Sequence, residues 1–317
     1  MAEIGKDILK AKALLEQGKL VAIPTETVYG LAGNALDVNA VTNIFKTKDR
    51  PHFDPLIVHV PSLDAAHAYV QNIPAKATEL AAAFWPGPLT LLLPKKDVVP
   101  DLVTSGLDRV GIRYPDHTLT QALLQSLSFP LAAPSANPFG YVSPTTPAHV
   151  NEQLGDKIEY ILDGGECTIG IESTIVGFEN DKPVLYRMGG LSVEQIESIT
   201  GPVSVQLNTS SNPKAPGQLK SHYAPRKRLV LGNITELLQT FGPYNVGILA
   251  FHQYRREVAK ENQLILSAEG NLEEAAHELF SALRQFDKMP VQVILAEEVP
   301  ERGLGRAIND RLRRAAG

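Results

Sequence analysis

The sequence predicts an α/β protein built from two domains of unequal size. Its 317 residues are more than a single hydrophobic core usually organises. Short apolar runs typical of strands alternate with amphipathic helical stretches along the chain. This alternation is interrupted at residues 202–228, where Ser, Pro and Asn are frequent and apolar residues are few. We therefore predict one domain over 1–201, a linker over 202–228 and a second domain over 229–317.

The composition is that of an ordinary soluble protein, with 44% hydrophobic and 21% charged residues. The net charge of -5 disfavours a protein whose main task is to grip a nucleic-acid backbone. The one cysteine, Cys167, excludes an intramolecular disulfide. No apolar run is long enough for a membrane span, and the N-terminal stretch is typical of an amphipathic helix rather than a signal peptide. We expect a cytoplasmic protein that makes no membrane contact.

The first predicted strand of the chain after the N-terminal helix is a buried apolar run at residues 20–25, which continues into a polar loop. In this loop Gly30 and Gly33 are expected to leave the backbone free to turn. A helix is predicted over 38–48 and a second strand over 55–60.

The end of that helix is basic, with Lys46, Lys48 and Arg50 ahead of Pro51. A solvated helix end, favoured by the helix dipole, is the plain interpretation of these cations. Their position near a polar loop that directly follows a buried strand favours ligand binding instead.

The same alternation continues through the rest of the first domain. Helices are predicted at the N-terminus up to Gly18, at 62–70, 74–87 and 118–130, and from Ser192. Strands are predicted at 89–94, 110–115, 130–134 and 173–176, with a helix and a short strand within 146–165.

Two further segments carry groups that could contact an anion. Arg109 and Arg113 lie on one face of the predicted strand, and a guanidinium buried there needs an anionic partner. A structural ion pair and a bound ligand both satisfy that need. After the next strand, Ser135, Asn137 and Ser143 offer polar groups among small residues, which suits close approach by a phosphate or a ribose.

The second domain reads as a small, mainly parallel α/β unit. Its strands are predicted at 229–233, 245–251, 262–268 and 291–299, and its helices at 234–241, 271–289 and 305–316. The glycines at 303 and 305 lack the further glycine of a dinucleotide-binding turn, so we expect this domain to dock the first one rather than bind a nucleotide.

Several common catalytic motifs are absent from the sequence. It contains no Walker A pattern, no HExxH, no paired CxxC and no GxSxG, and its histidines lack zinc-ligand spacing. No resident metal site is expected, and Cys167 is interpreted as a small buried residue rather than a nucleophile.

A series of motifs in order along the chain resembles the YrdC/Sua5 family, the threonylcarbamoyl-AMP synthases of tRNA modification. These motifs are PTETVYGL, KTKDRP, DPLIVHV, WPGPLTLLL, VGIRYPDH, APSAN, ESTIV, YRMG and SHYAP. The tail to Gly317 is similar to the extra domain of the longer Sua5 type. The resemblance implies a YrdC-like catalytic domain with a twisted mixed sheet and a Rossmann-like C-terminal α/β domain.

The resemblance also implies a nucleotidyltransferase reaction. L-Threonine, bicarbonate and ATP with Mg²⁺ would give threonylcarbamoyl-AMP and pyrophosphate. The product would pass to a tRNA threonylcarbamoyl-transfer complex that makes t6A at position 37, with at most a weak contact between this chain and tRNA. Such chemistry depends on positioning and on neutralising phosphate charge, which Lys and Arg side chains can supply.

Carried over motif by motif, the resemblance assigns two groups of residues. The threonine-binding group would be Thr27, His59, Arg113, Ala133 and Ser173. The ATP-binding group would be Lys48, Arg50, Asp54, Arg109, Ser135, Asn137, Ser143, Arg187 and Tyr223, with Lys48 and Arg50 catalytic. Asp54 and Arg109 depart from the family pattern, which often has Asn and an uncharged residue there. Because Tyr223 lies in the linker, we predict that the linker covers the site as a lid.

Two other classes of function stay open at this point. A non-enzymatic RNA-binding or ribosome-assembly factor could also use a basic cavity, although the acidic balance disfavours it. A carbamoyl-phosphate-dependent carbamoyltransferase is the second, although no acylphosphatase-like or zinc-finger segment accompanies the domain.

Overall fold

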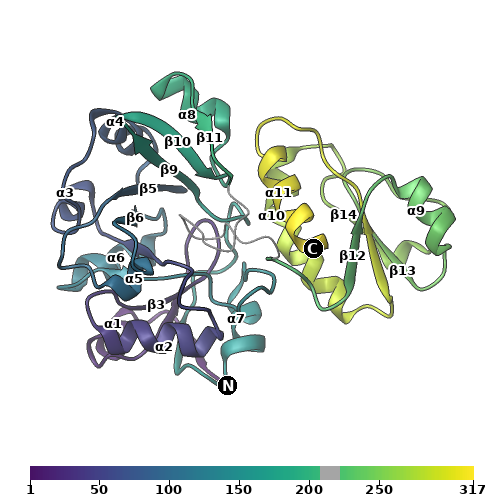
Figure 1. Ribbon diagram of the computed structural model, residues 1–317. Coiled ribbons are helices and arrows are strands. Elements are labelled where there is room, and N and C mark those ends of the chain that lie inside the picture. Colours follow the sequence, from purple (N-terminus) through teal and green to yellow (C-terminus); the bar gives the residue numbers. More distant parts are fainter. Residues whose placement is uncertain (208–221) are drawn as a thin grey trace.

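A computed structural model describes residues 1–207 and 222–317 of the chain. The chain forms a larger body on an 11-stranded sheet and a smaller body on a 4-stranded sheet. Figure 1 shows the two bodies side by side. The predicted α/β architecture is confirmed. The predicted linker is partly structured, because the larger sheet ends with β11 (Ser204–Val205) and the smaller begins with β12 (Arg228–Leu231). Linker residues 208–221 lie outside the described residues.

The larger sheet is mixed, with the strand order β1-β8-β2-β3-β7-β4-β6-β5-β9-β10-β11. Its other strands are β1 (Glu3–Gly5), β2 (Val21–Ile23), β3 (Gly30–Asn34), β4 (Ile57–His59), β5 (Leu89–Pro94), β6 (Arg109–Arg113), β7 (Leu131–Ala132), β8 (Tyr160–Leu162), β9 (Thr174–Glu179) and β10 (Lys182–Arg187). The helices of this domain are α1 (Ile8–Glu16), α2 (Val38–Lys48), α3 (Leu63–Ala66), α4 (Ala75–Phe84), α5 (Asp101–Thr104), α6 (Thr118–Ser126), α7 (Pro147–Leu154) and α8 (Val193–Thr200).

The smaller sheet has the order β12-β15-β13-β14, and every neighbouring pair is parallel, as the sequence predicts. Its remaining elements are α9 (Ile234–Phe241), β13 (Val246–Ala250), a 3₁₀ turn (Lys260–Asn262), β14 (Gln263–Ile265), α10 (Leu272–Lys288), β15 (Val293–Ala296) and α11 (Gly305–Ala316). In the described part of the chain, none of the helices is both long enough and apolar enough to cross a membrane.

The predicted glycine loop is instead a strand, so that expectation was wrong. β3 pairs antiparallel with β2, with Ala22 opposite Leu31. Gly30 and Gly33 are needed for close packing and not for a turn. A Cβ at Gly33 would come within 2.9 Å of the Leu20 side chain.

The N-terminal helix is shorter than predicted. Glu3–Gly5 forms the edge strand β1, parallel to β8, and α1 begins only after its N-cap, Asp7. The helical spacing of the following apolar residues concealed this short strand, because three residues are too few to show a period of two.

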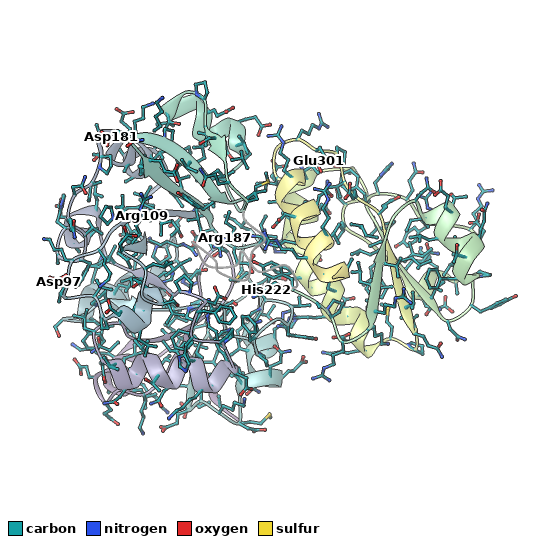
Figure 2. All side chains as sticks on the ribbon, in the orientation of Figure 1. Asp97, Arg109, Asp181, Arg187, His222 and Glu301 are labelled. Carbon is teal, nitrogen blue, oxygen red and sulfur yellow. The ribbon has the colours of Figure 1, made fainter. Side chains whose placement is uncertain are left out.

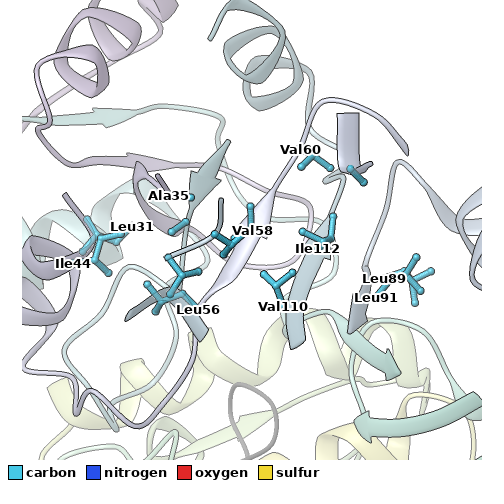
Figure 3. Packing of buried hydrophobic residues seen from close by; sticks show 14 of the residues in the cluster. Leu31, Ala35, Ile44, Leu56, Val58, Val60, Leu89, Leu91, Val110 and Ile112 are labelled. Atoms are coloured by element: carbon cyan, nitrogen blue, oxygen red, sulfur yellow. The ribbon is translucent and has the colours of Figure 1, made fainter. Parts of the chain in front are cut away.

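The centre of the larger sheet carries the main hydrophobic core. Leu31, Val58, Val110 and Ile112 are almost fully buried there, and Figure 3 shows them together with neighbours from β5 and α2. Burial of both faces explains why strands such as 55–60 read as continuous apolar runs. Two of these central strands, β4 and β6, carry His59 and Arg113, which are described below.

The two domains meet through α10 and α11, which lie on the side of the smaller domain that faces the larger one (Figure 1). The two backbones approach closely at Gly170, where φ is +83° and a Cβ would lie 2.5 Å from the Cα of His277 in α10. Only glycine fits this position without a shift of backbone.

Candidate active site

A cavity opens between the central strands of the larger domain and the chain that follows the undescribed segment. Its lining is Val28, Arg50, Pro55, Ile57, His59, Arg113, Ala133, Pro134, Ser135, Glu172, Ser173, Arg187, His222 and Tyr223. Three guanidinium groups therefore converge on one space, drawn from the loop after α2, from β6 and from β10. This convergence suits an anionic ligand.

Arg113 ends β6 and is held by two residues of the loop after β2. One of its terminal nitrogens lies 2.8 Å from Glu26 Oε1 and donates to Thr27 Oγ1 at 2.8 Å. Thr27 Oγ1 is in turn 2.8 Å from Thr25 Oγ1. The loop thus fixes the orientation of a buried guanidinium, which is the arrangement that a planar carboxylate ligand requires.

His59 lies on β4 and points into the cavity with only 2% of its surface exposed. Its Nδ1 makes no hydrogen bond to the described residues. Burial, together with the nearby charge of Arg113, lowers the pKa of His59 to about 3. A neutral imidazole with a free nitrogen is suited to a ligand hydroxyl rather than to an anion.

Arg50 is anchored just after α2. Its side chain pairs with Asp54 Oδ2 at 2.9 Å and donates to the carbonyl oxygens of Asp54 and Pro55. Asp54 is fully buried behind Arg50 and does not line the cavity. It therefore orients the guanidinium that does.

Lys48 is not at the cavity surface, contrary to the expectation of a phosphate ligand. It is 1% exposed, and its ammonium donates hydrogen bonds to the carbonyl oxygens of Ser135 and Asn137. Burial and the neighbouring charge of Arg50 lower its pKa well below the usual value. From the sequence, the basic end of this helix had two possible roles, a solvated helix end or a ligand contact. The structure shows a third, an internal clamp on the loop that carries Ser135.

Arg187 and Ser173 form the opposite wall. The guanidinium donates to Ser173 O through Nε at 3.0 Å and to Ser173 Oγ at 3.0 Å, and the hydroxyl is also 2.8 Å from Thr90 Oγ1. Beside them, Glu172 accepts a hydrogen bond of 2.5 Å from Ser143 Oγ. Ser143 therefore acts behind the wall, through Glu172.

His222 and Tyr223 close the cavity from the side of the smaller domain. Ala224 N donates to Gly140 O at 2.9 Å, which joins this segment to the larger domain. The Tyr223 ring stacks on Phe280 of α10 with centroids 5.5 Å apart. The part of the predicted lid at 208–221 lies outside the described residues, but its described end does reach the cavity.

The structure brings most of the predicted residues to one place. Those that line the cavity are Arg50, His59, Arg113, Ala133, Ser135, Ser173, Arg187 and Tyr223. Those that support its lining from behind are Thr27, Lys48, Asp54, Asn137 and Ser143.

Arg109 is the exception. It donates to Phe178 O at 3.0 Å and lines a different cavity with Glu179 and Tyr186. Figure 2 shows it away from Arg187 and His222, which lie where the larger domain faces α11. Arg109 and Arg113 are four positions apart on one face of β6, so they lie at opposite ends of the strand. We therefore leave Arg109 out of the site.

Sequence reasoning missed the two carboxylates of the site, Glu26 and Glu172. Both stand inside motifs that resemble the family, but neither motif shows that its carboxylate meets an arginine. Cys167 is buried as predicted, and burial raises its pKa, which disfavours the nucleophilic thiolate.

Two family models together match most of the chain. Residues 13–189 match the Sua5/YciO/YrdC family model, which is described as telomere recombination. Residues 191–317 match the model of the threonylcarbamoyl-AMP synthase C-terminal domain.

Full-length relatives match as well. The chain is 43% identical to threonylcarbamoyl-AMP synthase of Pyrococcus abyssi over 97% of this chain and 93% of that protein. It is 41% identical to the protein of the same name from Bacillus subtilis, over 98% and 93%. The crystal structure of P. abyssi Sua5 complexed with L-threonine superimposes with a TM-score of 0.92 at 41% identity, covering 100% of this chain and 98% of that one. The chain therefore belongs to the Sua5/YrdC family and to its longer, two-domain type.

Proposed function

We propose that this protein synthesises L-threonylcarbamoyl-AMP from L-threonine, bicarbonate and ATP and releases pyrophosphate. The observation that carries the proposal is the single cavity in which Arg50, Arg113 and Arg187 meet a neutral His59. The names of the relatives and the L-threonine complex of P. abyssi Sua5 support it, whereas they give no support to an RNA-binding factor.

Threonine occupies the end of the cavity between Arg113 and Ser173 in this proposal. The guanidinium of Arg113 binds the carboxylate, and the neutral imidazole of His59 meets the side-chain hydroxyl. Thr27 holds Arg113 in place, and the small side chain of Ala133 leaves room for the amino acid.

ATP occupies the rest of the cavity. Arg50 and Arg187 face the phosphates, Ser135 offers polar groups, and Tyr223 covers the nucleotide from the side of the smaller domain. Lys48 and Asn137 act indirectly, because Lys48 holds the loop that carries Ser135. The catalytic role expected of Lys48 thus becomes a supporting one, whereas Arg50 keeps its role at the phosphates.

The reaction needs no protein nucleophile. Threonine and bicarbonate form a carbamate with loss of water, and a carbamate oxygen then attacks the α-phosphorus. The bond from that phosphorus to the bridging oxygen breaks, and the electron pair leaves with pyrophosphate. The arginines neutralise the charge that develops on the leaving group. A carbamate is short-lived in water, so an enclosed cavity protects it.

We propose that Mg²⁺ arrives with ATP, bound to phosphate oxygens. Within residues 1–207 and 222–317, no group of three or more His, Cys, Asp or Glu side chains is arranged to hold a metal ion. The product would pass, in the cytoplasm, to an enzyme system that transfers the threonylcarbamoyl group to tRNA.

The test is pyrophosphate release by the full chain with threonine, bicarbonate and Mg²⁺ omitted in turn. We expect release to require all three, and mass spectrometry to detect threonylcarbamoyl-AMP. Arg50→Ala and Arg113→Ala should strongly reduce release under conditions in which the circular dichroism spectrum stays native. Release that is independent of threonine, or salt-sensitive RNA binding without any adenylate, would overturn the proposal.

A further inference from the structure

One arginine of the smaller domain is fully buried against the larger one. Arg311 projects from α11, and its Nε lies 2.9 Å from Glu172 Oε2. Its Nη2 donates to Met188 O at 2.9 Å, and the guanidinium carbon lies 4.9 Å from the centre of the Tyr223 ring. Arg311 therefore contacts two walls of the cavity without lining it.

Glu172 is the only carboxylate among the described residues that line this cavity. Both of its oxygens bond to groups outside the lining, Oε1 to Ser143 and Oε2 to Arg311. Burial by itself would raise the pKa of Glu172, but the charges of Arg311 and Arg187 and the hydrogen bond from Ser143 together lower it. The carboxylate is therefore ionised at neutral pH.

An ionised carboxylate in the wall of a cavity that binds a triphosphate opposes binding unless its charge is compensated. In a buried setting this repulsion is weakly screened by solvent. An uncompensated Glu172 could also pair with Arg187, whose charge already acts on it. Either outcome would lower the affinity of the cavity for an anion.

We propose that Arg311 is a positioning residue of the active site, which compensates the charge of Glu172 and holds its carboxylate back from the nucleotide. The smaller domain thereby completes the ATP site of the larger one. The inference depends on the proposed function, since it concerns the same cavity.

The surrounding contacts show why a purely structural role must be separated from this one. Arg284 of α10 donates to the carbonyl oxygens of Val142 and Ser143, and His222 N donates to Arg314 O at 3.3 Å. Helices α10 and α11 thus also hold the wall mechanically. Loss of Arg311 could act through this packing, so the experiment must vary charge and packing independently.

The experiment compares Arg311→Met, Arg311→Lys and the double variant Glu172→Gln/Arg311→Met in the full chain. The matched control is Arg313→Met on the same helix, because Arg313 pairs with Glu298 and Glu301 at the exposed surface. Steady-state pyrophosphate release gives KM for ATP, KM for threonine and kcat. Calorimetry gives the Kd of ATP, and thermal melting reports folding.

We expect Arg311→Met to raise KM and Kd for ATP by about tenfold or more, the scale on which an unpaired buried charge acts. KM for threonine should stay within about twofold, because Arg113 has its own carboxylate partner. Arg311→Lys should retain much of the affinity. Removing the carboxylate in the double variant should restore most of it, and Arg313→Met should match the unaltered protein.

A double variant as weak as Arg311→Met would overturn the inference, since packing and not charge would then be at fault. So would an equal rise in the KM values for ATP and threonine. If Arg311→Met does not fold, Arg311→Gln and Glu172→Gln/Arg311→Gln carry the same comparison, since glutamine also removes the charge. If the unaltered protein shows no threonine-dependent pyrophosphate release, the proposed function fails, whereas the Kd of ATP still decides the role of Arg311.

Discussion

The buried pair of Glu26 and Arg113 allows a stability role to be separated from a binding role. Their side chains are 7% and 5% exposed, and the charged atoms lie 2.8 Å apart. Arg113→Met leaves the Glu26 carboxylate buried without its cation. Removing one partner of such a pair typically costs about 3–5 kcal/mol, because the remaining charge is not solvated.

The double variant Glu26→Gln/Arg113→Met removes both charges. Replacing a whole buried pair by uncharged groups is often nearly neutral, so the double variant should recover most of the lost free energy of unfolding. Urea denaturation at pH 7 measures this difference. Lys19→Met is the control, because Lys19 pairs with Glu159 at the surface, where such pairs contribute only about 0–1 kcal/mol.

Activity should behave differently from stability. If Arg113 binds the threonine carboxylate, losing a charged hydrogen bond of about 1.5–3 kcal/mol lowers kcat/KM for threonine by roughly 10- to 150-fold. The double variant should stay impaired although it is stable again. Recovery of kcat/KM together with stability would refute the assignment of Arg113 to threonine, and an unchanged stability of Arg113→Met would refute the analysis of the pair.

Three further predictions concern single positions. Lys48→Met should lower the free energy of unfolding, measured by urea denaturation, by about 1–3 kcal/mol for each carbonyl left without a donor. Steady-state kinetics should show a larger rise in KM for ATP than in KM for threonine. A fully stable variant with normal KM values would contradict the role of Lys48 in holding the loop. His59 has a pKa of about 3 when folded and about 6.5 when unfolded, so between these values the unfolded chain binds the extra proton and stability falls as pH falls. His59→Gln should lose less stability than the unaltered protein between pH 6.5 and 5, by up to about 1.4 kcal/mol per pH unit in denaturation curves, and parallel curves would exclude this cause. Arg109→Met should leave kcat and both KM values within about twofold, because Arg109 lines another cavity. A large loss of kcat/KM would show that Arg109 does act in the active site.

Local sequence signals predicted the elements well where the hydrophobic period was clear. The strands at 55–60 and 89–94 and the helix at 38–48 lie where expected, because each buries a continuous face or stripe. Gly30–Asn34 was mistaken for a loop because glycine frees a chain to turn and also admits close packing, and only the neighbouring side chains distinguish the two.

The sequence predicted many of the residues that line the cavity, but not the contacts that hold them in place. The resemblance supplied Arg50, Arg113 and Ser173, all of which reach the cavity. It could not supply the partner of each cation. Glu172 and Arg311 are 139 positions apart and meet only because two domains dock. The burial of Lys48 likewise depends on a loop almost ninety positions further along, which it meets only in the folded sheet.

The close contact at Gly170 restricts how the two domains can be displaced relative to one another. Its α-carbon sits against the backbone of α10 with no space for even one methyl group, so sliding one body across the other would drive main chain into main chain. A rotation that pivots near Gly170 avoids this clash, whereas a slide towards α10 does not.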